Sequence, residues 1–126
     1  MKYLVDTNIF LEILLQQEKS NSCKIFLDDN VGSLHISDFS LHSIGVILFK
    51  QDRAELFQKF LADIISRTNL ISLPKTQYQS IINFKKDFHL DFDDAYQCSL
   101  SKHFQLKIIT MDKDFTKVKN LSLEFL

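Results

Sequence analysis

Short apolar segments alternate with longer helical patterns along the whole chain, and this alternation is the strongest constraint on its fold. The apolar segments are nearly continuous, as in strands that are buried on both faces of a sheet. Strands of this kind that alternate with helices are typical of a parallel sheet covered by helices on both sides. The sequence therefore predicts an α/β fold of three layers, α/β/α, around a central parallel sheet of about four to five strands.

The individual elements are placed from apolar periodicity and from helix boundary signals. Strands are expected at residues 3–5, 33–37, 70–73, 106–110 and 121–126. Helices are expected at residues 8–16, 20–27, 38–50, 53–67, 75–86 and 92–103. Ser20 or Asn21 is the expected N-cap of the second helix, and Asp91 that of the last. The clearest amphipathic pattern lies in the fourth helix and consists of Phe57, Phe60, Leu61 and Ile64.

Size and composition fit one domain over residues 1–126. The chain is 45% hydrophobic and has only two glycines and one proline, which argues against a loop-rich or disordered protein. Its net charge of −1 gives no strong electrostatic attraction for nucleic acid. Cys23 and Cys98 have neither disulfide-framework nor zinc-site spacing. Without a signal-peptide pattern or a membrane-spanning apolar run, a cytoplasmic protein is expected.

Acidic residues follow two of the expected strands and begin one of the expected helices. Asp6 follows strand 3–5, Asp112 follows strand 106–110, and Asp94 lies in the first turn of helix 92–103. The carboxyl ends of parallel strands lie along one edge of the sheet, and the N-terminus of a helix can face the same edge. We therefore expect these three aspartates to converge on a site for a divalent metal ion, which prefers oxygen ligands.

Each acid also has a structural explanation. Asp6 or Asn8 could cap the following helix, and capping by Asn8 alone would leave Asp6 free for a metal. The three aspartates within residues 91–94 are favoured in a first helical turn by the helix dipole. Asp112 and Asp114 could be loop and cap residues. However, three acids within four residues exceed what one helix end requires, and a cation would relieve their repulsion. A shared metal site is therefore the preferred interpretation.

Three motifs resemble those of the PIN-domain family when they are taken in order. They are Val5-Asp6-Thr7-Asn8, Asp94-Ala95 and the segment 109–115, Ile-Thr-Met-Asp-Lys-Asp-Phe. The resemblance spans essentially the whole chain and is closest to the small single-domain VapC-type toxin ribonucleases. It implies an endoribonuclease whose acids hold Mg²⁺ or Mn²⁺, and the ion activates water at the scissile phosphate. By position in the motifs, Asp6, Asp94 and Asp112 would be the catalytic and metal-binding residues.

The same resemblance implies supporting residues and partners. Thr110 matches a hydroxyl residue that supports the site by hydrogen bonding, and Asp114 would be an additional or substitute ligand. Thr7 or Asn8 would orient Asp6. The implied partners are a single-stranded RNA substrate, a cognate antitoxin protein and a second copy of the chain in a homodimer.

The chain departs from the family pattern at the second acid. The family usually has a glutamate on the helix after the second strand, whereas Ser43 occupies that position here. A neutral hydroxyl is a weak ligand for a hard cation. Glu12 or Asp38 could supply the missing charge, or His42 could contribute through water or contact an RNA phosphate. The alternative to a ribonuclease is a catalytically weak or inactive PIN-like module that binds RNA or protein.

Overall fold

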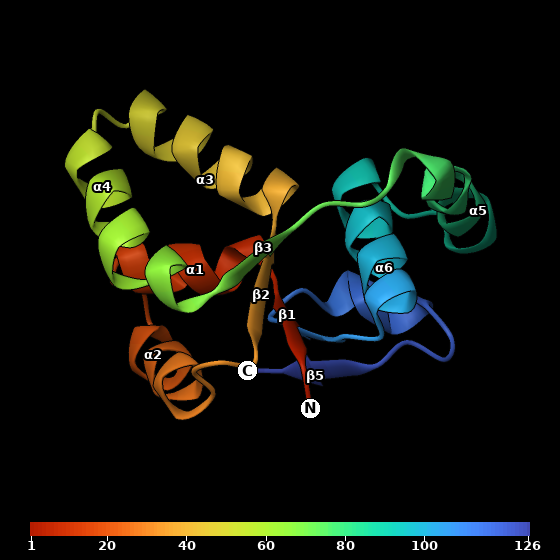
Figure 1. Ribbon diagram of the computed structural model, residues 1–126, viewed down its shortest axis with the longest axis horizontal. Helices are drawn as coiled ribbons and strands as arrows, with labels where there is room; N and C mark the ends of the chain where they lie inside the picture. Colours follow the sequence, from red (N-terminus) through yellow and green to blue (C-terminus); the bar gives the residue numbers. More distant parts are fainter.

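A five-stranded, fully parallel sheet forms the centre of the computed structural model, which describes all residues from 1 to 126 (Figure 1). The strand order is β3-β2-β1-β4-β5. The strands are β1 (Tyr3–Val5), β2 (Leu34–Ser37), β3 (Asn69–Ile71), β4 (Lys107–Thr110) and β5 (Leu123–Phe125). The predicted parallel sheet and its number of strands are confirmed.

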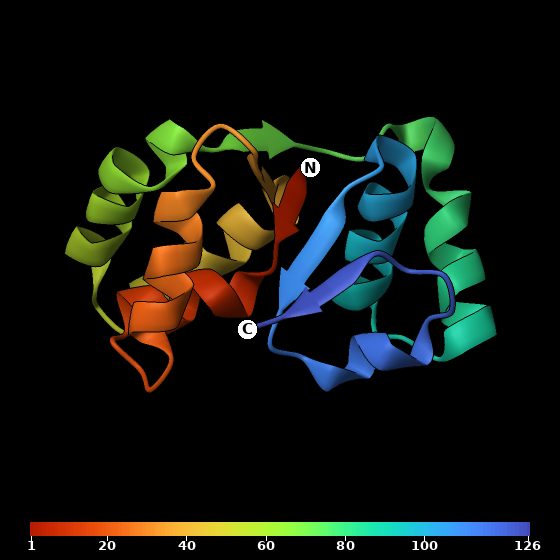
Figure 2. The ribbon, with the colours of Figure 1, turned by 90° about the horizontal axis from the view of Figure 1, so that it is seen from below.

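Six α-helices cover the two faces of this sheet. They are α1 (Thr7–Leu14), α2 (Ser20–Asp29), α3 (Asp38–Lys50), α4 (Ala54–Asp63), α5 (Gln79–Phe88) and α6 (Phe92–Phe104). Helices α1 to α4 lie on one side of the sheet and α5 and α6 on the other, as Figures 1 and 2 show from two directions. The three-layer α/β/α arrangement predicted from the sequence is therefore confirmed.

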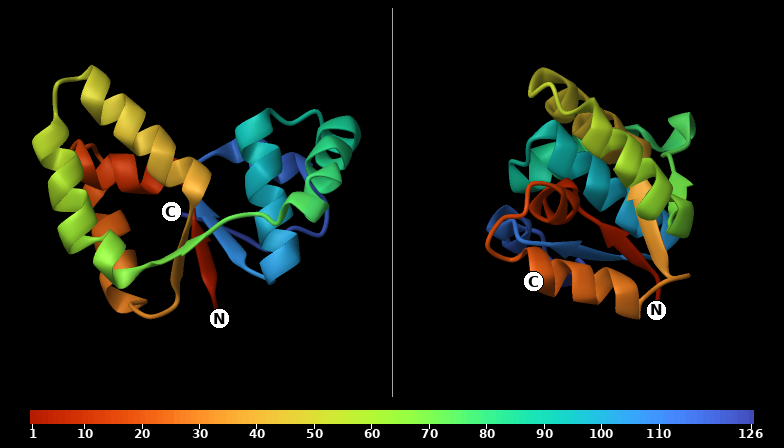
Figure 3. Two further views of the ribbon diagram at one scale, coloured as in Figure 1. Left: turned by 45° about the horizontal axis from the view of Figure 1, so that its top comes forward. Right: turned by 90° about the vertical axis from the view of Figure 1, so that its left-hand side faces the viewer.

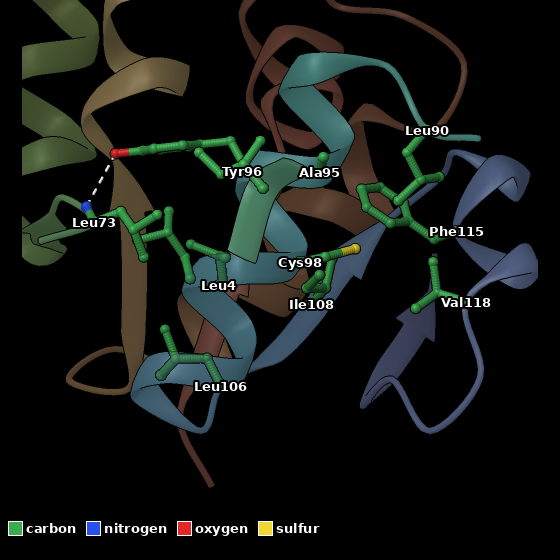
Figure 4. Close-up of a cluster of buried hydrophobic side chains, with 12 residues drawn as sticks. Leu4, Leu73, Leu90, Ala95, Tyr96, Cys98, Leu106, Ile108, Phe115 and Val118 are labelled. Atoms are coloured by element: carbon green, nitrogen blue, oxygen red, sulfur yellow. Dashed lines mark hydrogen bonds between the residues drawn. The ribbon is translucent and has the colours of Figure 1, made fainter. Parts of the chain in front are cut away.

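Neighbouring residues on the central strands point to opposite faces of the sheet, because side chains alternate along a strand. Leu4 and Ile108 belong to the hydrophobic cluster beneath α5 and α6, which Figure 4 shows. Val5 and Ile109 belong to the cluster beneath α1 to α4. All four side chains are fully buried. Burial on both faces explains why these strands read as continuous apolar runs rather than as alternating patterns.

The largest differences between predicted and observed helix boundaries occur at the fourth and fifth helices. The fourth was expected to reach residue 67, but α4 ends at Asp63 and a short 3₁₀ turn, Ile65–Arg67, follows. Phe60 and Ile64 face the core as expected, whereas Leu61 is 41% exposed. After Pro74 the chain first forms a 3₁₀ turn, Lys75–Gln77, before α5 begins at Gln79.

The expected N-caps were only partly right. Lys19, rather than Ser20 or Asn21, occupies the N-cap position of α2, and its side chain makes no capping hydrogen bond. Asp91 does occupy the N-cap position of α6, but its carboxylate accepts no hydrogen bond from the helix. At α3 the N-cap is Ser37, whose hydroxyl accepts a hydrogen bond from Ser40 N.

The strand order reverses direction between β1 and β4. From β1 the chain proceeds outward to β2 and β3, and it then returns to place β4 on the other side of β1. Figure 3 shows the two groups of helices diverging from the sheet at this point. Such a reversal leaves a crevice beyond the carboxyl ends of the two strands, where ligands bind in open α/β sheets. Asp6 follows β1 directly, and Asp112 follows β4 by two residues.

No helix of the structure combines the length and the apolar character that crossing a membrane would require.

Candidate metal site

Asp6 is held at the junction of β1 and α1 by hydrogen bonds to both carboxylate oxygens. Its Oδ1 accepts from Thr7 N at 2.8 Å, and its Oδ2 accepts from Thr110 Oγ1 at 2.6 Å. Asp6 itself is the N-cap of α1, and Asn8 lies inside the helix. Of the two caps considered from the sequence, the structure therefore uses Asp6 and not Asn8. Capping does not use up Asp6, since a carboxylate offers about four lone-pair sites.

Thr110 connects Asp6 with the loop that carries Asp112. Its hydroxyl donates to Asp6 Oδ2 and accepts a hydrogen bond from Asp112 N at 2.9 Å. Asn8 Nδ2 also approaches Thr110 Oγ1, at 3.5 Å. The fully buried hydroxyl thus orients Asp6 and the start of the following turn together. The supporting role expected for Thr110 stays a prediction, and Asn8 reaches Asp6 only through the Thr110 hydroxyl.

Three further carboxylates lie close to one another, in a group that does not include Asp6. Asp94, Asp112 and Asp114 each offer an oxygen atom, and these atoms lie within 4.8 Å of one another. Asp94 comes from the first turn of α6, and the other two begin the 3₁₀ turn Lys113–Lys117. Asp112 Oδ1 also accepts a hydrogen bond from Asp114 N at 2.9 Å. Asp114 is exposed, whereas Asp94 is buried.

The pKa values of Asp94 and Asp6 are both raised, mainly by burial. Burial raises the pKa of Asp94 to about 7, and the neighbouring charges, first of all that of Asp93, add to the effect. Burial also raises the pKa of Asp6, although its hydrogen bonds oppose the increase. Both shifts show that the folded protein disfavours the bare carboxylates. A bound cation would reverse this preference, because an opposite charge stabilises the ionised form.

The expected acids share one pocket of about 320 Å³. Asp6, Asp94 and Asp112 line it, and Ser43 lines it as well. Ser43, at the position where the family usually has the second acid, thus lies in the same pocket as the three expected aspartates. Other side chains that line the pocket are Thr7, Asn8, Leu11, Phe39, Ile47, Asp93 and Gln97.

Gln97 is a site residue that the sequence reasoning missed. Its side-chain nitrogen donates to Asp6 Oδ1 at 3.3 Å and to Ser40 Oγ at 3.2 Å. Ser40 in turn accepts a hydrogen bond from Thr7 Oγ1 at 2.7 Å. One sequence signal pointed to Gln97: it follows Asp94 by three residues, a spacing that places both on one face of a helix.

Two residues that line the pocket carry a buried amide oxygen without a hydrogen-bond partner, namely Asn8 Oδ1 and Gln97 Oε1. An unsatisfied buried acceptor costs roughly 1–3 kcal/mol. Carboxylate and amide oxygens are the ligands that hard divalent cations such as Mg²⁺ prefer. The carboxylate and amide oxygens of the residues around this pocket therefore fit Mg²⁺ or Mn²⁺ as ligands.

The residues considered as replacements for the missing acid lie elsewhere. Glu12 is buried near the end of α1, where its Oε2 accepts a hydrogen bond from Lys19 N at 2.7 Å. Asp38 Oδ1 accepts from Phe39 N and from Tyr96 Oη, each at 2.8 Å. Asp38 lines a separate groove together with His42, and none of the three candidates lines the acidic pocket. The structure therefore brings no acid to the position of Ser43.

The class defined by this fold and pocket is a parallel α/β protein with aspartates gathered beyond the ends of β1 and β4. The model of the PIN-domain family matches residues 3–121. The chain belongs to the PIN-domain family, and the resemblance noted in its motifs is confirmed. No curated protein matches the chain.

Solved structures of toxin proteins share the fold. DNA-bound VapBC from Salmonella typhimurium is 14% identical, with a TM-score of 0.84 over 99% of this chain and 98% of that chain. VapBC2 from Rickettsia felis, bound to a promoter DNA fragment, is 20% identical, with a TM-score of 0.80 and the same two coverages. Mycobacterium tuberculosis VapC20, described as a toxin that cleaves the sarcin-ricin loop, is 11% identical, with a TM-score of 0.76 over 91% of this chain and 93% of that chain.

Proposed function

We propose that this protein is a Mg²⁺- or Mn²⁺-dependent endoribonuclease that cleaves single-stranded RNA and serves as the toxin of a toxin–antitoxin pair. The observation that carries the proposal is the convergence of Asp6, Asp94 and Asp112 on one pocket, with unpartnered amide oxygens beside them. Membership of the PIN-domain family supports a nuclease. The structural likeness to VapC20, described as a toxin that cleaves the sarcin-ricin loop, supports RNA as the substrate.

In this proposal Asp6, Asp94 and Asp112 hold the ion, which when bound lowers the pKa of water and neutralises charge on the scissile phosphate. The protein contributes mainly by positioning its acids before the substrate arrives. Asp6 is oriented by the hydroxyl of Thr110 and by the backbone of Thr7. The carboxylate of Asp94 accepts no hydrogen bond from the protein, so both carboxylate oxygens remain free for the ion.

The decisive test is RNA cleavage with Mn²⁺ or Mg²⁺ by the purified protein and by Asp6→Asn. The substitution should abolish cleavage, because Asn cannot supply the charge that holds the ion, and chelation by EDTA should do the same. Asp29→Asn, on the exposed face of α2, is the matched control and should cleave normally. Cleavage that survives both Asp6→Asn and EDTA would overturn the proposal.

A second candidate function follows from Ser43, which lies in the pocket where the family usually has a glutamate. With one carboxylate fewer, the protein would be a weak or inactive enzyme that binds RNA or a protein partner. This reading predicts RNA binding without turnover, measured with the same substrate by fluorescence anisotropy. It also predicts that Ser43→Glu creates cleavage activity. Turnover by the wild-type protein at rates typical of enzymes would exclude it.

We propose that the antitoxin partner covers an apolar groove between α3 and α4. The groove is lined largely by Leu41, Val46, Phe49 and Phe57, and Phe49 is 63% exposed. Exposed apolar surface of this kind is typical of protein interaction sites. The solved relatives include toxin–antitoxin complexes, which supports an antitoxin as the occupant.

Phe49→Asp tests this assignment, because a charge in the groove should abolish binding of the proposed cognate antitoxin. Ile25→Asp is the matched control, since Ile25 is 60% exposed on α2 outside the groove. Isothermal titration should show loss of binding for Phe49→Asp only. Equal affinities for the two variants would exclude the groove as the antitoxin site.

We further propose that the chain forms a cytoplasmic homodimer of single domains spanning residues 1–126. A candidate contact surface consists of Tyr78 and Phe92, which are 44% and 55% exposed and both pack on the buried Tyr96. Light scattering after size exclusion should give twice the mass of the chain, and Phe92→Lys should give a monomer. A monomeric wild-type protein would contradict this assignment.

A further inference from the structure

Gln97 lines the acidic pocket and carries a buried amide oxygen that no group in the protein satisfies. The side chain is 2% exposed, and its Oε1 has no hydrogen-bond partner. Its Nε2 donates to Asp6 Oδ1 and to Ser40 Oγ. These two bonds determine the orientation of the amide, because a rotated amide would place its oxygen against the carboxylate of Asp6. The free oxygen is therefore a consequence of how the amide supports Asp6.

The same pocket lacks the carboxylate usual at the position of Ser43. The pocket is lined by Asp6, Asp93, Asp94 and Asp112, and the hydroxyl of Ser43 is a poor substitute for a further carboxylate. A hard cation accepts amide oxygens of Asn and Gln together with carboxylates. An amide oxygen adds a ligand without adding negative charge. It therefore adds no repulsion to the aspartates that already share the pocket.

We propose that Gln97 Oε1 is a metal ligand in this protein and takes the place of the carboxylate that is absent at Ser43. This inference rests on the proposed function, since it requires that a divalent cation bind among the three aspartates. Gln97 then has two roles in one side chain. Its nitrogen orients Asp6, and its oxygen completes the set of metal ligands.

The test compares Mn²⁺ affinities of the full chain, measured by electron paramagnetic resonance of free Mn²⁺ and without any RNA. Gln97→Leu should weaken Mn²⁺ binding by about tenfold or more, because both the nitrogen and the oxygen are lost. Gln97→Glu should restore affinity to the wild-type level or above, because a carboxylate oxygen replaces the amide oxygen. If Gln97 acts only through its nitrogen, Glu and Leu will weaken binding alike, and the inference is overturned.

Ser43→Glu provides an independent check. If Gln97 compensates for the absent acid, Ser43→Glu should tighten Mn²⁺ binding, and Gln97→Leu should cost less in that background than in the wild type. Strictly additive effects of the two substitutions would contradict a shared role. Ser99→Ala is the matched control on α6, because Ser99 is 1% exposed but bonds to Ser80 outside the pocket. Its Mn²⁺ affinity should match that of the wild type.

The outcomes separate this inference from the proposed function. If the wild-type protein binds no Mn²⁺, or if Asp94→Asn does not weaken its binding, both proposals are overturned. If Asp94→Asn removes binding but Gln97→Leu leaves it unchanged, only the role of Gln97 is overturned. Circular dichroism spectra confirm that each variant is folded before its affinity is compared.

Discussion

Glu12 and Asp94 are equally buried, each 8% exposed, yet the protein treats the two acids in opposite ways. The carboxylate of Glu12 accepts a hydrogen bond from Lys19 N and ties the end of α1 to the start of α2. The carboxylate of Asp94 accepts no hydrogen bond and lies close to those of Asp112 and Asp114. The comparison teaches that burial alone does not identify a functional acid. A cation suits Asp94, because its carboxylate has no hydrogen-bond donor and lies among other acids.

The largest expected effect is on RNA cleavage. Asp94→Asn should reduce the rate with Mn²⁺ by roughly 10²–10³-fold or more, as loss of major electrostatic stabilisation does. Glu12→Gln should leave the rate within about threefold, because it lies outside the pocket and Gln can still accept from Lys19 N. Initial rates at equal concentrations of folded protein give both values. A large loss of rate in Glu12→Gln would remove the distinction between the two acids.

The same two acids should affect stability with opposite signs when no metal is present. Glu12→Ala should lower the free energy of unfolding by roughly 1–3 kcal/mol, because Lys19 N loses its charged acceptor. Asp94→Asn at pH 8 should instead raise the melting temperature by roughly 2–6 °C, because it removes a disfavoured charge. Thermal melts in EDTA measure both. Destabilisation by Asp94→Asn under these conditions would mean that its charge is already compensated within the protein.

The pH dependence of stability should follow from Asp94. Burial raises its pKa to about 7 in the folded protein, from an ordinary value of 3.8. The folded state then holds a proton that the unfolded chain has released, so stability falls as pH rises between about 4 and 7. In EDTA the wild-type protein should lose stability across this window, and Asp94→Asn should lose less. Saturating Mn²⁺ should flatten the wild-type curve, since the ion favours the carboxylate. A steeper decline with Mn²⁺ than without it would contradict this assignment.

The smallest expected effect comes from the most exposed member of the acidic group. Asp114→Asn should weaken Mn²⁺ binding by only a few-fold, because solvent screens an exposed charge and its backbone bond to Asp112 is retained. The measurement is the same resonance titration that tests Gln97. A loss as large as that of Asp94→Asn would show that Asp114 is a principal ligand and would shift the centre of the site toward the loop after β4.

The order of elements was readable from the sequence because it depends on local patterns. Apolar runs buried on both faces predict parallel strands, and their alternation with helices predicts the layers. That rule also placed Asp6 and Asp112 at the same edge of the sheet. The boundaries around Pro74 and at the end of α4 were less accurate, because 3₁₀ turns replace regular helix there.

The amino-acid sequence by itself determined the layers, the family motifs and the three aspartates that converge, since each follows from spacing along one element or from the rule for strand ends. Only the tertiary structure decided which contacts the side chains of Gln97 and Glu12 make. Gln97 contacts Asp6, which lies 91 positions earlier in the chain. Polar residues on α6 are buried because that helix lies between the sheet and α5 (Figure 1). Glu12 does not line the acidic pocket, and its carboxylate instead accepts a hydrogen bond from Lys19 N that no sequence motif predicts. Contacts between distant segments depend on how whole elements pack, and local patterns carry no record of them.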